Sequence, residues 1–260
     1  MKRKILTVAI CMAMAAVTLF GCGNASSHEP VKILIAAAAS LENAYVDELI
    51  PMFEKKYDYI TVEGTYDSSG KLQTQIEAGL SADIFMSAAT RQMTALKEEG
   101  MIDADSIVNL LENKLVLIVP ADAQTDITGF EDITRADMIA IGDPDSVPAG
   151  QYAKEAFTNI GNWEEVSSKV SLGTNVTEVL RWIEEGSADA GIVYATDAAS
   201  SDKVRVIAEA PEGSLEKPVI YPVGILSGTE HSDEAKLFED FLQSEEALAV
   251  FEKYGFTVNK

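Results

Sequence analysis

Apolar residues follow two alternating patterns along the chain. Short runs rich in β-branched residues predict strands, and segments with apolar residues every three or four positions predict helices. The predicted strands cover residues 31–35, 60–63, 83–86, 115–119, 138–141, 191–194, 204–208 and 219–226. The predicted helices cover residues 41–56, 71–78, 90–99, 152–159, 177–185, 233–242 and 245–254. This alternation predicts an α/β protein with parallel-rich sheets flanked by helices on both faces.

Two strand-like segments, residues 113–120 and 219–226, have no helix directly attached and bracket the middle of the chain. They are interpreted as crossovers between two lobes. The first lobe is predicted to contain residues 31–114 and 222–260, and the second to contain residues 115–221. A ligand cleft is expected between the lobes, beyond the carboxyl ends of the parallel strands.

The N-terminus has the pattern of an export signal. Basic residues at positions 2–4 precede an uncharged apolar stretch that ends at Cys22, so residues 1–21 are predicted to be a signal peptide. The sequence around the expected cut, LFGC, resembles a lipoprotein box and predicts lipidation of Cys22. A plain signal peptide cleaved nearby is the alternative. Residues 22–30 are small and polar, which predicts a flexible tether.

The remaining composition excludes several functions. The formal net charge is -22 at pH 7, and the acidic residues are spread along the chain, so nucleic acid is not expected as a partner. Cys11 lies in the signal and Cys22 at the predicted anchor, so the folded part has no cysteine. Disulfides and thiolate metal sites are therefore excluded there.

The first predicted strand leads into its helix through four alanines and Ser40, in the sequence AAAASLENA. Ser40 stands where a helix N-cap belongs. Ordinary capping would explain the serine, but the alanines also leave room for a ligand to approach the first backbone N–H groups of the helix. Those groups have no partner within a helix and attract anions.

Similar corners recur later in the chain. Two small hydroxyl residues precede a helix in DSSGKLQTQIEAG, although the glycine spacing is not that of a Walker A loop. The other corners are a proline-led helix start in VPAG, a cap in TNVTEVL and a strand end in GIVY. The residues singled out at these corners are Ser69, Ala149, Val176 and Tyr194. None is lysine or arginine, which indicates a desolvated anion site made of neutral donors.

These sequences resemble the extracytoplasmic molybdate-binding proteins of ABC import systems. The resemblance extends from AAAASLENA through SSGKLQTQIEAGLSADIFMSA, GDPDSVPAGQYAKEA and AGIVYATDA to FEKYGFTV near the C-terminus. It implies a two-lobed, type II periplasmic-binding-protein fold that closes on a tetrahedral oxyanion. Gly70 and Asn175 depart from the family's usual residues, another small hydroxyl and an acid respectively, which leaves the fine selectivity open.

The resemblance also implies a ligand set and a biological role. Hydroxyl and backbone donors would come from Ser40 and Ser69, backbone N–H groups from Ala149 and Val176, and a phenol from Tyr194. The expected protein is a non-enzymatic, monomeric receptor for molybdate and tungstate, without a cofactor or direct metal-cation ligands. Exported and lipid-anchored on the outer face of the membrane, or periplasmic, it would deliver its ligand to an ABC permease.

Two alternatives remain open. A receptor for another tetrahedral oxyanion, such as sulfate or thiosulfate, would use the same donors. Anions that only accept hydrogen bonds differ for such a site in size alone, so cavity size would decide which one binds. Phosphate is disfavoured because its proton needs an acceptor and the five candidates include no carboxylate. A secreted serine hydrolase using Ser40 or Ser69 is more distant, since only His28 and His231 could act as base and the chain has no Gly-x-Ser-x-Gly motif.

Overall fold

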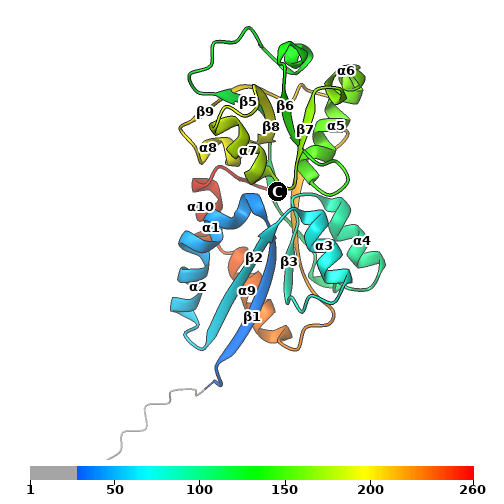
Figure 1. The fold of residues 1–260 in the computed structure, drawn as a ribbon. Coiled ribbons are helices and arrows are strands. Elements are labelled where there is room, and N and C mark those ends of the chain that lie inside the picture. Colours follow the sequence, from blue (N-terminus) through cyan, green and yellow to red (C-terminus); the bar gives the residue numbers. More distant parts are fainter. Residues whose placement is uncertain (1–27) are drawn as a thin grey trace, which may run out of the picture.

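The computed structural model describes residues 28–260, which form two lobes placed one above the other (Figure 1). The predicted signal peptide and Cys22, and all of the tether up to residue 27, lie outside the described residues. Every helix and strand of the described part lies between Val31 and Val258. The chain from Ser26 onward therefore contains every described helix and strand.

A six-stranded mixed sheet forms the centre of the first lobe, in the order β11-β4-β10-β3-β1-β2. Its strands are β1 (Val31–Ala38), β2 (Ile60–Asp67), β3 (Ile84–Met86), β4 (Val108–Asn113), β10 (Val219–Ile225) and β11 (Thr257–Val258). β1 pairs in parallel with β2 and β3, whereas β10 is antiparallel to β3 and β4. The carboxyl ends of the three parallel strands therefore share one edge.

A five-stranded mixed sheet forms the second lobe, in the order β7-β6-β8-β5-β9. Its strands are β5 (Leu115–Pro120), β6 (Ile139–Gly142), β7 (Val170–Gly173), β8 (Ala190–Tyr194) and β9 (Val204–Glu209). β6 pairs in parallel with β7 and β8, and β5 is antiparallel to β8 and β9. The predicted fold class is confirmed, and the antiparallel pairs arise where the chain crosses between lobes.

The chain passes between the two sheets twice. β4 ends at Asn113 and β5 begins at Leu115, so a single residue separates the two sheets. The return lies between β9 and β10. Residues 219–221 were expected in the second lobe, but Val219 pairs with Asn113 across the first sheet. Backbone pairing thus places the whole of β10 in the first lobe.

Helices cover both sheets. Those of the first lobe are α1 (Glu42–Ala44), α2 (Ile50–Lys56), α3 (Ser69–Glu77), α4 (Thr90–Glu98), α9 (Ser232–Leu242) and α10 (Glu245–Lys253), with short 3-10 turns η1 (Ala39–Leu41) and η3 (Ala104–Ser106). Those of the second lobe are α5 (Pro148–Ile160), α6 (Trp163–Ser167), α7 (Val176–Glu184) and α8 (Ala195–Ala199), with the 3-10 turn η4 (Phe130–Arg135).

The first predicted helix, residues 41–56, is not one regular α-helix. A π turn, η2 (Tyr45–Leu49), separates α1 from α2, and Pro51 lies at the start of α2. Pro51 has no N–H to donate to the carbonyl of Asp47, and its ring crowds that carbonyl. The wider π turn accommodates the proline without ending the helical path.

Aromatic side chains fill the first lobe beneath α9 and α10. Phe53 packs edge to face on Phe238 at a centroid distance of 4.7 Å, and Tyr45 packs against Phe251 at 5.9 Å. All four rings are fully buried. The C-terminal helices therefore complete the core of the first lobe.

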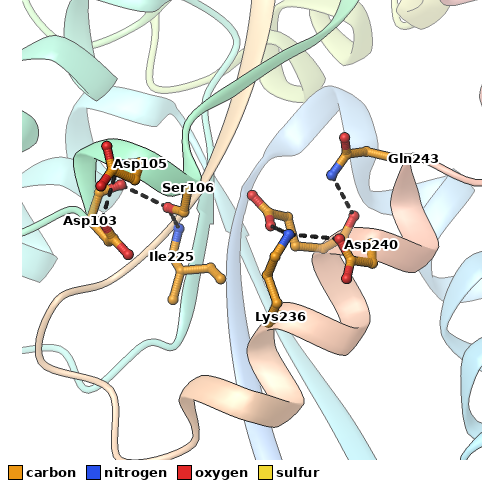
Figure 2. Close-up of polar contacts among 8 residues, drawn as sticks. Asp103, Asp105, Ser106, Ile225, Lys236, Asp240 and Gln243 are labelled. Carbon is orange, nitrogen blue, oxygen red and sulfur yellow. Dashed lines mark hydrogen bonds and ion pairs between the residues drawn. The ribbon is translucent and has the colours of Figure 1, made fainter.

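Polar contacts fasten η3 to β10 on the same lobe (Figure 2). The Ser106 hydroxyl accepts a hydrogen bond from the Ile225 N–H at 2.8 Å and donates to the Asp103 carbonyl at 2.8 Å. On α9, the Lys236 ammonium group contacts the Asp240 carboxylate at 2.6 Å.

None of the helices within residues 28–260 has the length and apolar character needed to cross a membrane.

Candidate ligand site

A small cavity lies where the two lobes meet. The first lobe contributes the carboxyl ends of β1, β2 and β3, and the second contributes the starts of α5 and α7 and the end of β8. The lining residues are Ala38, Ala39, Ser40, Asp67, Ser68, Ala88, Val147, Pro148, Asn175, Val176 and Tyr194. The cavity is small, because the centre of a water-sized sphere can occupy only about 10 Å³ in it, far below the roughly 300–1,000 Å³ typical of sites for drug-sized ligands. A drug-sized ligand is therefore excluded from the arrangement described.

Hydrogen bonds between the lobes surround this cavity. The Gly70 N–H donates to the Ser146 carbonyl at 2.9 Å, and the Asn175 amide donates to the Asp67 carboxylate at 3.2 Å. A third bond joins the side chains of Gln92 and Gln151 at 3.2 Å. The lobes are therefore in contact, and the described arrangement is a closed one.

The corner after β1 is built differently from the prediction. Ala38, not Ser40, is the N-cap residue, and Ser40 lies inside the 3-10 turn η1. The Ser40 hydroxyl is 2.9 Å from the Tyr221 hydroxyl, so it does not cap the helix. The strand continues through the buried alanines to Ala38, because their small side chains allow close packing on both faces of the sheet.

Tyr221 orients the Ser40 hydroxyl. The Asn113 amide donates to the Tyr221 oxygen at 3.3 Å. Either hydroxyl can donate in the bond between Tyr221 and Ser40, and when Tyr221 donates, the Ser40 hydrogen is left for a ligand. Burial raises the pKa of the fully buried Tyr221 phenol well above its usual value, so the group keeps its proton. The sequence analysis did not select Tyr221, because an apolar-rich strand gave no sign that its phenol would reach Ser40.

The second corner begins α3 at Ser69, two residues earlier than predicted, with Ser68 as its N-cap. The Ser69 hydroxyl accepts a hydrogen bond from the Ala88 N–H at 2.9 Å, which ties the start of α3 to the end of β3. Ser69 is fully buried, and its neighbour Ser68 lines the cavity. The Ser69 hydroxyl can still donate its own hydrogen.

Two helix starts face the cavity from the second lobe. Pro148 opens α5, as predicted, and the helix packs so closely on β6 that a Cβ at Gly150 would lie 1.9 Å from the Gly142 carbonyl oxygen. The Asn175 side chain caps α7 by accepting from the Glu178 N–H at 3.0 Å. Both helices present free N–H groups and a partial positive charge at these ends.

Tyr194 ends β8 and points its phenol across the lobe boundary. Its hydroxyl lies 3.4 Å from the Ala88 carbonyl of the first lobe. Burial, followed by neighbouring Tyr221, raises the pKa of Tyr194 well above its usual value. The phenol therefore remains a hydrogen-bond donor at neutral pH.

One carboxylate lines the cavity, and the sequence analysis did not consider it. Asp67 accepts hydrogen bonds from the Ser68 N–H at 2.7 Å and from the Asn175 amide, and it pairs with the Lys71 ammonium group at 3.3 Å. These donors, together with the N-terminus of α3, offset its charge. Asp67 ends β2, so its place at this edge follows from the parallel pairing with β1.

The five predicted residues gather around this one cavity, although not all line it. Ser40, Val176 and Tyr194 belong to the lining. Ser69 and Ala149 are fully buried directly behind it, each next in the chain to a lining residue. Their predicted role as ligand contacts stays a prediction.

Outside the interlobe cavity, the described residues form fewer groups of side chains that could bind a ligand. A larger, open depression at the far end of the first lobe is lined by residues that include Lys32, Asp83 and His231. The Asp83 carboxylate there accepts from the Leu34 N–H at 2.6 Å, so it is engaged in the fold. Within residues 28–260, no three histidine, aspartate or glutamate side chains come together as metal ligands.

The fold and the interlobe cavity define a solute-binding protein. The sequence profile of the bacterial extracellular solute-binding protein family matches residues 33–257, and the chain belongs to this family. Members of the family bind solutes for ABC transporters and are not enzymes.

Individual relatives are similar over most of the chain. A Bacillus subtilis (strain 168) protein named "Putative ABC transporter substrate-binding lipoprotein YvgL" is 41% identical over 94% of this chain and 96% of its own. "Molybdate-binding protein ModA" of Escherichia coli (strain K12) is 38% identical over 95% of this chain and 96% of its own. The solved "substrate binding domain of putative molybdenum ABC transporter from Clostridium difficile" has a TM-score of 0.68 and 37% identity, covering 88% of this chain and 100% of its own.

Proposed function

We propose that the protein captures molybdate, and also tungstate, between its lobes and delivers it to the permease of an ABC importer. The observation that carries this proposal is the cavity itself, which is closed by both lobes and lined by hydroxyl groups and helix starts. No lysine, arginine or histidine is among its described lining residues. The 38% identity to a molybdate-binding protein supports the choice of ligand.

Neutral donors suit a fully desolvated oxyanion. Molybdate and tungstate carry only acceptor oxygens at neutral pH, so each oxygen can take an N–H or O–H hydrogen without leaving a donor of the ligand unpaired. In a small cavity from which water is excluded, these hydrogen bonds act at a low local dielectric and are strong. The N-termini of α3, α5 and α7 add partial positive charge from both lobes.

Closure couples ligand capture to lobe movement. Ser40 belongs to the first lobe, whereas Val176 and Tyr194 belong to the second, so one ion can contact all of these groups only when the lobes meet. The ligand therefore binds the closed arrangement more tightly than an open one and shifts the population toward it. A permease could then distinguish the loaded protein by its closed shape.

The protein would act outside the cytoplasm. The basic start, the apolar stretch and Cys22 support export and lipid anchoring on the outer face of the membrane, as does the lipoprotein name of the B. subtilis relative. The predicted tether of residues 22–30 would let the folded lobes reach the permease. We expect one chain to bind one ion as a monomer, with no cofactor.

The ligand is tested by isothermal titration of the chain from Ser26 onward. Molybdate, tungstate, sulfate, thiosulfate and phosphate are titrated in parallel. We expect one molybdate or tungstate per chain and binding of the other anions at least about tenfold weaker, a difference of about 1.4 kcal/mol. Phosphate is a demanding competitor, because Asp67 supplies the acceptor that its proton requires.

The outcomes distinguish an error in the named ligand from an error in the proposed oxyanion function. If sulfate or phosphate binds as tightly as molybdate, the receptor stands and the named ligand is wrong. If none of the five anions gives heat or raises the melting temperature, the oxyanion function is wrong. Light scattering of the same sample tests whether the protein is a monomer.

Replacing Tyr221 with phenylalanine tests the orientation of Ser40. Tyr221→Phe keeps the ring and removes the hydroxyl that lies 2.9 Å from the Ser40 hydroxyl. Losing one such bond costs about 0.5–1.5 kcal/mol, so molybdate affinity should fall about 2- to 10-fold. Ser40→Ala in the same background should then cost less than it does alone, because the two groups act together. Strictly additive losses would contradict the coupling.

A further inference from the structure

Ser68 has an unpaired hydroxyl at the cavity. The residue is only 4% exposed, and its Oγ atom has no hydrogen-bond partner in the described protein. Ser68 is also the N-cap of α3, yet its side chain makes no capping bond. Leaving a buried hydroxyl unpaired costs about 1–3 kcal/mol, so a partner from outside the chain is indicated.

Each of the other hydroxyls at this site already makes one hydrogen bond within the protein. Ser40 lies against Tyr221, and Ser69 accepts from the Ala88 N–H. Tyr194 lies 3.4 Å from the Ala88 carbonyl. The backbone N–H of Ser68 is fixed by the Asp67 carboxylate at 2.7 Å, which holds the residue in place and leaves its side chain as its only free donor.

We propose that the Ser68 hydroxyl donates directly to the bound oxyanion, as a ligand contact additional to the set implied by the family resemblance. This inference rests on the proposed oxyanion function. A serine hydroxyl can accept and donate at once, but an oxyanion offers only acceptors, so Ser68 would act as the donor. Adjacent Ser68 and Ser69 would then contribute separately, the first through a hydroxyl on the cavity wall and the second from behind it.

The contact also explains the missing cap. A serine at the N-cap usually turns its hydroxyl toward the N–H groups of its own helix. The Gly70 N–H in the first turn of α3 donates instead to the Ser146 carbonyl of the second lobe at 2.9 Å. The Ser68 hydroxyl is therefore left for a ligand, close to the positive end of the helix.

Ser68→Ala tests the contact by titration of the chain from Ser26 onward with molybdate. We expect affinity to fall roughly 10- to 100-fold, the effect of losing a hydrogen bond to a charged group. The melting temperature without ligand should stay the same or rise, because the variant removes an unpaired buried hydroxyl. The rise in melting temperature caused by molybdate should shrink.

Ser214→Ala is the matched control. Ser214 is likewise 4% exposed and its Oγ atom also lacks a partner, but it does not line the cavity. Its variant should bind molybdate as the parent does. Parental affinity in Ser68→Ala, with the parent binding well, would overturn the Ser68 contact and leave the function standing. A parent that binds none of the five anions would instead overturn the function itself.

Discussion

Gly70→Val should weaken ligand binding by about 5- to 150-fold while leaving both lobes folded. Gly70 is where the start of α3 touches the second lobe, and a Cβ there would lie 2.4 Å from the Ser146 carbonyl oxygen and 2.8 Å from the Ser146 Cα atom. Both are backbone atoms that cannot rotate away. The lobes of the variant can therefore not approach to the distance at which the Gly70 N–H donates to Ser146.

The size of this effect follows from overpacking. Inserting atoms into a well-packed contact costs about 1–3 kcal/mol, and every 1.4 kcal/mol changes affinity tenfold. The cost falls only on the closed arrangement, because an open protein has no contact at this point.

Titration with molybdate measures the loss of affinity, and thermal unfolding without ligand tests whether both lobes remain folded. Gly228→Val is the control, because Gly228 is exposed and a Cβ there would meet nothing within 4 Å. The control should match the parent in both measurements. If Gly70→Val binds as tightly as the parent, the loaded protein does not close to the contact described here.

Much of the fold could be predicted because its strands are apolar and its helices amphipathic. The strands that escaped prediction, β4, β7 and β11, are short or carry a weak pattern. β4 contains asparagine and glutamate beside its leucines, and it is stable as a strand only because β10 and β11 pair with it. β11 has two residues, too few for any periodicity.

The site was predicted in outline, because helix starts and strand ends can be located from local signals. Which atom of each corner faces the cavity could not be predicted. Ser68 and Ser69 are adjacent and chemically identical, and only the contact between Ser69 and the Ala88 N–H, 19 positions away, distinguishes them. Tyr221 reaches Ser40 across 181 positions of sequence, a distance over which no local pattern operates.

Asp197 gives the protein a pH-dependent stability. The residue is 7% exposed in α8, and its carboxylate accepts from the Tyr194 N–H at 3.0 Å. Burial raises the pKa of this carboxyl group from 3.8 to about 7, and the hydrogen bond from Tyr194 opposes the rise only in part. The folded protein therefore holds a proton on Asp197 that the unfolded chain releases.

The sign follows from which state binds more protons. Between pH of about 4 and 7 the folded state binds more, so the free energy of unfolding falls as pH rises through this interval. A pKa rise from 3.8 to about 7 corresponds to an effect on the order of 4 kcal/mol. This contribution is absent below the unfolded pKa and reaches its full destabilising size above the folded one.

Asp197→Asn should remove this dependence. The amide oxygen can still accept from the Tyr194 N–H, but the side chain no longer ionises. We expect the variant to match the parent near pH 4 and to exceed it in stability by up to about 4 kcal/mol at pH 8, measured by urea unfolding without ligand at each pH. Asp202→Asn, an exposed substitution a few residues later, controls for the change in net charge. A stability difference that stays constant across this pH range would show that Asp197 ionises in the folded protein as it does in the unfolded chain.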